Sequence, residues 1–364
     1  MMISHSTLKT RISEIKSLME THLLDVIILF DPCNIYYFTN FPRGLALIIP
    51  TNHNPILFVS RLEYEEACSI VKNASVITVE KRSKLVDLLY NELTKESRPS
   101  TIGLCKASIT ASLYENLKSK FEGFNIKESS DLINELRSIK SHEEIELIVK
   151  ALRIAEFGMK SAIEAINEGK NEIEIAGEAE YAMRKAGAEW FSFKTIVVSG
   201  YRSAYPHGSP TCKKIRENEL VVIDLGAKYC GYCSDITRTV YTGNNMPPEI
   251  FEIFEVVNNA IDEAVKIAKE GIKAREIDVA ARKIISEKGY GEYFVHSLGH
   301  GVGLNVHESP RLSQDSDDIL RAGNVVTIEP GIYIPNLGGV RIEEMAIIEK
   351  NQCKILNELP RILK

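Results

Sequence analysis

The sequence lacks long apolar runs, a dense set of cysteines and an excess of basic residues. Its longest apolar stretches, such as 26–30 and 45–50, fall far short of the roughly 20 residues that a transmembrane helix needs, so we expect no membrane partner. The net charge is -6, which provides no overall basic field, so we expect no nucleic-acid partner either. Seven cysteines scattered along 364 residues favour a reducing compartment over a disulfide framework.

The first twenty residues also lack the features of a secretory signal. Charged and apolar residues alternate there at helical spacing, without an apolar stretch or a small-residue cleavage site. Together with the cysteine usage, this predicts a cytoplasmic protein. The chain is 44% hydrophobic and long enough for two domains, each with its own core.

The first part of the chain, residues 1–132, has the pattern of an α/β domain. Short apolar runs alternate there with segments of helical periodicity. The runs lie at 24–30, 45–50, 55–60, 75–79 and 101–104, and the helical segments at 63–71, 85–93 and 113–117. An aromatic segment, 31–41, has no cluster of acids and histidines, and we interpret it as packing or as a wall over another site.

A second domain is predicted over 133–364. Ser141 and Glu144 form the pattern of a capping box before an apolar helical stretch. The expected elements are helices at 141–167 and 172–187, strands at 195–199, 219–227 and 235–241, helices at 249–269 and 274–288, and strands at 325–329 and 340–348. Because helices followed by strands occur twice, we expect two similar halves with a central site between them.

Asp224 and Asp235 lie in two β-like runs on either side of a Tyr-Cys-Gly turn. A hairpin would bring the two carboxylates together among apolar residues. Such a pair is costly to bury unless it is protonated or neutralised by a cation. Considered alone, the pair favours metal binding less than the ordinary alternative, since an aspartate in a strand usually caps a turn or meets a solvated partner.

Three of the eight histidines, His296, His300 and His307, fall within twelve glycine-rich residues. The segment could be a flexible loop with solvent-facing imidazoles. A phosphate cradle is another option, but no strand and helix flank these glycines in the required order. Metal binding or proton transfer is the interpretation that we favour.

A second carboxylate pair, Glu329 and Glu343, borders two apolar runs joined by a Pro/Gly-rich turn. The simplest alternative is an exposed hairpin with charged rims, and Glu344 fits such a rim residue. Apolar residues precede both Glu329 and Glu343, which favours burial.

Four carboxylates and one imidazole suit Mn²⁺, Co²⁺, Fe²⁺ or Zn²⁺ better than metals bound by thiolates. The ligand charge of about −4 matches two divalent ions, and a water between such ions would be acidified into a hydrolytic nucleophile.

The ordered motifs IDLGA, SDITRT, GHGVGLNVHE, TIEPG and GVRIE resemble the metal-site signature of the metallopeptidase family that contains prolidase, aminopeptidase P and methionine aminopeptidase. The resemblance covers about 140–360 and implies the pita-bread fold. The N-terminal part resembles the creatinase-type domain of prolidase and aminopeptidase P, so the expected fold is α/β (α+β) with these two domains.

The resemblance also implies a role for each metal ligand. Asp224 would bind one ion, His300 and Glu329 the other, and Asp235 and Glu343 would bridge them. Two divalent ions per chain are implied, Mn²⁺ or Co²⁺ first, with Zn²⁺ or Fe²⁺ as alternatives. Glu329 would also accept a proton from the attacking water.

Four further residues receive roles from the same resemblance. His207, in SGYRSAYPHGSP, would stabilise the oxyanion. His307 would contact the scissile or prolyl region, and His296 would lie beside the site. Arg341 would support a ligand or bind the substrate carboxylate.

The activity implied is hydrolysis of Xaa-Pro dipeptides before proline, with an Xaa-Pro aminopeptidase on longer peptides as the alternative. A non-catalytic peptide-binding relative is a third possibility, but all five ligand positions are intact. The family resemblance also implies a homodimer. One departure is Met345, which stands after Glu344 where the family commonly has Thr after an acidic residue.

Overall fold

The computed structural model describes residues 2–95, 99–167 and 169–361. The chain divides into two units, Met1–Arg137 and Ser138–Lys364. None of the described helices is long and apolar enough to cross a membrane. All seven cysteines are free thiols, but only Cys105 and Cys233 among them are buried.

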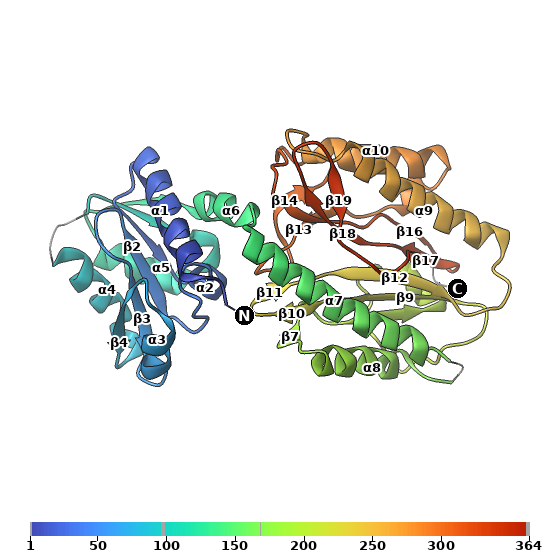
Figure 1. The fold of residues 1–364 in the computed structure, drawn as a ribbon, viewed down its shortest axis with the longest axis horizontal. Coiled ribbons are helices and arrows are strands. Elements are labelled where there is room, and N and C mark those ends of the chain that lie inside the picture. The colour runs from blue at the N-terminus through green and yellow to red at the C-terminus, as the bar shows by residue number, and fades with distance from the viewer. Residues whose placement is uncertain (1, 96–98, 168, 362–364) are drawn as a thin grey trace. The chain divides into compact units, whose positions relative to one another are not determined.

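The first unit is a six-stranded mixed sheet with helices packed against it (Figure 1). The strand order is β4-β3-β2-β1-β5-β6; β2 is antiparallel to both its neighbours, and the other pairs are parallel. Its strands are β1 (Val26–Leu29), β2 (Ala46–Pro50), β3 (Ile56–Ser60), β4 (Ser75–Val79), β5 (Thr101–Leu104) and β6 (Asn125–Glu128). Its helices are α1 (His5–Thr21), α2 (Pro32–Thr39), α3 (Tyr64–Ile70), α4 (Leu85–Thr94) and α5 (Ala111–Lys120), with 3-10 turns η1 (Arg82–Lys84) and η2 (Lys106–Ser108).

The sequence predicted this α/β pattern, apart from α2 and β6. That strand reads Asn-Ile-Lys-Glu and none of its residues is buried, so it has no apolar run to reveal it. The aromatic segment forms α2, which begins at an Asp31 cap and buries most of its residues, as the packing interpretation required. Helix α6 (Ser130–Ser138) leads to the boundary between the units.

The second unit repeats an order of two helices followed by strands. Its helices are α7 (His142–Ala165), α8 (Glu172–Lys185), α9 (Pro248–Ile267) and α10 (Ala274–Glu287), with 3-10 turns η3 (Gly200–Ala204) and η4 (Gly291–Tyr293). Its strands are β7 (Trp190–Phe191), β8 (Ile196–Ser199), β9 (Leu220–Leu225), β10 (Ala227–Tyr229), β11 (Tyr232–Cys233), β12 (Ile236–Tyr241), β13 (Gly299–Gly301), β14 (Glu308–Leu312), β15 (Val325–Ile328), β16 (Gly331–Ile334), β17 (Gly338–Arg341), β18 (Glu344–Ile348) and β19 (Cys353–Ile355).

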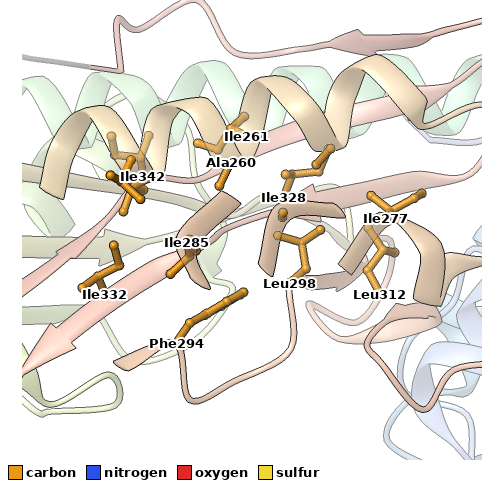
Figure 2. Packing of buried hydrophobic residues seen from close by; sticks show 14 of the residues in the cluster. Ala260, Ile261, Ile277, Ile285, Phe294, Leu298, Leu312, Ile328, Ile332 and Ile342 are labelled. Carbon is orange, nitrogen blue, oxygen red and sulfur yellow. The ribbon is translucent and has the colours of Figure 1, made fainter. Parts of the chain in front are cut away.

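Within this unit the strands lie between the helix pairs. Helices α7 and α8 pack on the strands of the first half, and α9 and α10 pack on those of the second (Figure 1). The predicted capping box is present, since Ser141 accepts from the amide of Glu144 and Glu144 accepts from the amide of Ser141. Under α9 and α10, aliphatic side chains such as Ile261, Ile328 and Ile342 form one buried cluster (Figure 2).

Candidate metal centre

The first carboxylate pair lies on the predicted hairpin. Strands β9 and β12 are antiparallel, and Asp224 is opposite Thr237. The hairpin continues as β10 and β11, where Cys230 (φ 48°) and Gly231 (φ 81°) make a two-residue turn. Positive φ at both positions is the requirement of a type I′ turn. Asp235 directly precedes β12, and only 5% of it is exposed.

His300 lies in β13 between two glycines that permit close packing. A Cβ on Gly299 would lie 2.1 Å from the carbonyl oxygen of Thr327, and one on Gly301 would lie 2.3 Å from that of Ser309. Strand β13 can therefore lie between β14 and β15 and direct its histidine inward. The sequence did not predict β13, because glycine-rich runs are typical of loops, or β14, whose five residues ESPRL include a proline and two charged residues.

Glu329 and Glu343 lie at the ends of paired strands. Ile328 of β15 pairs with Glu344 of β18. Glu329 comes directly after β15 and Glu343 directly before β18, so both lie at the same edge of the sheet. The single strand predicted for 340–348 is wrong, since β17 ends at Arg341 and β18 begins at Glu344. Between them the amide of Glu343 donates to the carbonyl oxygen of Thr237 at 3.2 Å, which connects the two hairpins.

The candidate ligands converge at this junction. Asp235, His300 and Glu343 each offer an atom within 4.8 Å of the others. The Nε2 atom of His300 lies 3.2 Å from Oε1 of Glu329 and 3.7 Å from Oδ2 of Asp235. Asp224 adjoins the same group, because Thr237, which lies opposite it, donates to Oε2 of Glu343 at 2.9 Å.

Burial is the largest influence on these carboxyl groups, and the four acids repel one another. Burial and then the charge of Glu343 hold the pKa of Asp235 well above its usual value. Burial and then the charge of Glu329 do the same for Glu343. Burial would also raise the pKa of Glu329, but the hydrogen bond and charge of His300 outweigh it and lower that pKa to about 2.

Arg341 is buried beside these acids. Its Nη2 donates to Oδ2 of Asp224 at 2.7 Å, its Nε to Oγ1 of Thr237 at 3.1 Å and its Nη1 to the hydroxyl of Tyr333 at 2.8 Å. Nη1 also donates to the carbonyl oxygen of Pro206 at 3.2 Å. Four of the five N–H donors of the guanidinium are therefore used by protein groups.

Tyr333 was not among the residues singled out from the sequence. Its hydroxyl lies 2.9 Å from Nε2 of His296 and accepts from Arg341, so it connects the two. Burial raises its pKa to about 12, which keeps the phenol protonated at neutral pH. Its position in the short apolar strand β16 gave no sign of this role, because a core tyrosine would have the same neighbours in sequence.

The remaining histidines border the same site. His207 and His307 have exposed side chains, and the ring centroids of His307 and His300 are 4.2 Å apart. Burial is the main cause of the lowered pKa values of His296 and His307, and the charge of His207 lowers both further. The structure thus brings all nine candidate residues to one region of the second unit.

Glu344 is not the exposed rim residue that the sequence indicated. It is 2% exposed and pairs with Arg238 at 3.3 Å and Arg361 at 3.1 Å. At the departure from the usual motif, Sδ of Met345 lies 3.3 Å from the amide nitrogen of Asp235.

The residues fit divalent cations. Oδ1 of Asp224 and Oε1 of Glu343 are buried without a hydrogen-bond partner among the described residues. Unpartnered buried oxygens of carboxylates are expensive, and a hard cation would satisfy them. Such a site at the junction of two helix-covered sheets defines a metal-dependent hydrolase as the class of protein.

Comparison with known proteins identifies the family. The pattern of Metallopeptidase family M24 matches residues 146–350, and that of the Creatinase/Prolidase N-terminal domain matches residues 11–139. The chain belongs to metallopeptidase family M24 and carries the creatinase-type N-terminal domain, which confirms the fold and family predicted from the motifs.

Individual relatives are similar over nearly their full length. A protein of Pyrococcus furiosus named Xaa-Pro dipeptidase is 45% identical over 98% of this chain and 100% of its own. The crystal structure of the prolidase from Pyrococcus horikoshii is 43% identical, with a TM-score of 0.90 over 97% of this chain and 99% of that one. An X-Pro aminopeptidase structure from Thermotoga maritima is 35% identical, with a TM-score of 0.89 over 97% of this chain and 99% of that one.

Proposed function

We propose that this chain is an Xaa-Pro dipeptidase that hydrolyses the peptide bond preceding proline. The observation that carries the proposal is the 45% identity to the Pyrococcus furiosus relative over 98% of this chain and 100% of that one. The acid and histidine cluster supplies the chemistry that this activity needs.

The proposed site holds two divalent ions, with Mn²⁺ or Co²⁺ ahead of Zn²⁺ or Fe²⁺. Asp224 would hold one ion and His300 with Glu329 the other, while Asp235 and Glu343 would bridge them. The unpartnered oxygens of Asp224 and Glu343 support this assignment. When bound, the ions supply Lewis acidity and an acidified water.

The chain's own residues would handle protons and substrate. Both hydrogen bonds of Glu329 are made by Oε1, so among the described residues Oε2 has no partner and can accept a proton. His207 would donate to the oxyanion and the exposed His307 would contact the prolyl end. His296 would lie beside the site. Arg341, which already uses four of its five N–H donors within the protein, would orient Asp224 instead of binding the substrate carboxylate.

A dipeptide and a tripeptide with the same start test the activity. With Mn²⁺-reconstituted enzyme we expect a higher kcat/KM for Leu-Pro than for Leu-Pro-Ala, and chelation should abolish both. Amidation of the dipeptide carboxylate should cost about 2 kcal/mol of transition-state binding, the scale of one charge-assisted hydrogen bond. Full activity in protein shown to be free of metal would refute the metal assignment.

The second candidate is an Xaa-Pro aminopeptidase, favoured by the similarity to the Thermotoga maritima structure. Faster cleavage of the tripeptide, with indifference to amidation, would select it. A cytoplasmic location and a homodimer complete the proposal. The free cysteines support the first, and light scattering would test the second.

A further inference from the structure

Glu172 is a fully buried carboxylate that none of the site chemistry above uses. It is the first residue of α8, and its relative exposure is 0%. Its Oε1 accepts from the amide of Ser199 at 2.8 Å and from its hydroxyl at 2.9 Å. Its Oε2 accepts from the amide of Thr211 at 2.9 Å, from its hydroxyl at 2.8 Å and from Nη1 of Arg202.

All five of these donors belong to residues 199–211, the segment that contains His207. Ser199 and Thr211 are the two ends of the segment, so one carboxylate binds both ends and holds them together. Arg202 extends the connection, since its Nη2 donates to the carbonyl oxygen of Ser209 at 2.9 Å. The buried charge of Glu172 thus holds the backbone of the segment at both ends, while Arg341 makes a separate contact with the carbonyl oxygen of Pro206 at 3.2 Å.

His207 depends on that backbone for its position. Its side chain is exposed and makes no hydrogen bond within the described part of the chain. Hydrogen bonds to a charged group are stronger than those to a neutral one, so removing the charge of Glu172 would weaken all five of them. A displacement of a catalytic group by about 1 Å can cost about 10²-fold in rate.

The second half of the unit holds its own histidine segment in a comparable way. Asp278 of α10 is also 0% exposed; it accepts from Arg282 at 2.8 Å and from the amide of Leu298 at 2.9 Å. Arg282 in turn donates to the carbonyl oxygen of His296 at 2.8 Å. A buried acid on the second helix of each half, paired with an arginine, holds a segment that borders the metal centre.

We propose that Glu172 is the positioning residue for His207, holding residues 199–211 so that the imidazole faces the reacting carbonyl. The proposal rests on the proposed function, because it takes His207 to act in catalysis. Glu172 itself touches neither substrate nor metal.

The test compares Glu172→Gln with Glu174→Gln in metal-loaded protein. Glu174 lies in the same turn of α8 and is exposed; it caps the helix without contacting the His207 segment, so it controls for helix stability. In Glu172→Gln we expect hydrogen exchange of residues 200–209 to accelerate about tenfold or more, with metal content unchanged. Turnover of Leu-Pro should fall about 10- to 100-fold with KM altered little. Glu174→Gln should leave both readouts near wild type.

A double-mutant cycle separates positioning from general support. His207→Ala should lower turnover by about 10²–10³-fold, and adding Glu172→Gln should lower it by less than about twofold more. Multiplicative losses in the double variant, or unchanged exchange in Glu172→Gln, would overturn the proposal. If Glu172→Gln does not fold, Thr211→Val and Thr211→Ser replace it in the test. The valine removes one hydroxyl donor to Glu172 and the serine retains it. Hydrogen exchange and turnover must therefore differ between these two variants.

The outcomes also distinguish this proposal from the proposed function. Full turnover in His207→Ala would overturn the positioning proposal, because His207 would then have no catalytic role for Glu172 to support. A wild-type protein that cleaves no Xaa-Pro peptide would refute the proposed function, while hydrogen exchange would still decide whether Glu172 holds the segment.

Discussion

Replacing Asp235 by Asn should stabilise the metal-free protein and destabilise the metal-loaded one. Asp235 is buried among other acids, and burial followed by the charge of Glu343 raises its pKa well above the usual value. The amide has a similar shape but no charge. It therefore removes repulsion in the absence of metal, and it removes a proposed bridging ligand in the presence of metal.

The magnitude follows from the geometry. Ligand atoms of Asp235 and Glu343 lie within 4.8 Å of each other. Two unit charges at that separation repel by about 3 kcal/mol at an effective dielectric constant of about 20. Protonation relieves part of this repulsion, and the contact with His300 offsets some more of it. We therefore expect Asp235→Asn to raise the free energy of unfolding of the metal-free protein by about 2 kcal/mol. For a domain of this size that is about 4–8 °C in Tm.

Thermal unfolding with and without Mn²⁺ measures both effects. In excess EDTA the variant should unfold at the higher temperature. At an Mn²⁺ concentration of about 100 times Kd, each occupied site adds about 2.7 kcal/mol to the wild type, and the order should reverse. Asp317→Asn, at a side chain 86% exposed, is the control and should change little.

The pH dependence of unfolding tests the sign of this stability difference independently. Because the folded-state pKa of Asp235 is raised, its contribution to stability is present at low pH and is lost as pH rises through that pKa. The difference between metal-free wild type and variant should therefore grow with pH and vanish in acid. Equal Tm values without metal at every pH, or equal stabilisation by Mn²⁺, would refute the reasoning.

Two further predictions concern metal binding and packing. Because the pKa values of Asp235 and Glu343 are raised without metal, metal binding should release protons, and the apparent metal affinity should fall as pH falls. Calorimetry in buffers of different ionisation enthalpy measures the proton release. Binding heats that do not depend on the buffer would contradict it. Gly299→Ala should lower stability by about 1–3 kcal/mol and weaken metal binding, because its Cβ would lie 2.1 Å from a carbonyl oxygen. Gly177→Ala on α8, where a Cβ meets nothing within 4 Å, should instead raise stability by up to about 1 kcal/mol, and equal effects of the two in urea unfolding would argue against the packing explanation.

The four carboxylates of the candidate centre could be selected from the sequence because each lies beside an apolar run near a turn, and His300 because it belongs to a cluster of three histidines. Antiparallel pairing then brings Asp224 and Asp235 together, since a two-residue turn at Cys230 and Gly231 fixes the hairpin. Predictions made from neighbouring residues were wrong where the polar partners of a residue lie far along the chain. Glu344 looked like a rim residue because nothing near it in sequence shows that Arg238 and Arg361 neutralise it.

The break between β17 and β18 has a similar cause. Apolar residues around Glu343 indicate one continuous strand, but its amide pairs with the carbonyl oxygen of Thr237 in the other hairpin. Tyr333 likewise acquires its role only through Arg341 and His296, which reach it from other strands and loops. Periodicity specifies the face of a strand on which a residue lies, and it carries no information about polar partners far along the chain.

The polar contacts of the centre share one arrangement that explains how a group of acids can be ordered and still be available to cations. Arg341 holds Oδ2 of Asp224 and leaves Oδ1 without a partner. Thr237 holds Oε2 of Glu343 and leaves Oε1, and Glu329 makes both its hydrogen bonds through Oε1. One oxygen of each of these three carboxylates is thus fixed by the protein while the other is open.

Arg238 adds positive charge without occupying those open oxygens, because it donates to the backbone carbonyl groups of Thr237 and Glu343 at 3.0 and 2.6 Å. Fixed orientation reduces the entropy lost when a cation binds, and the remaining repulsion makes that binding favourable. The energetic disadvantage of burying these acids is therefore the source of the site's affinity for divalent ions.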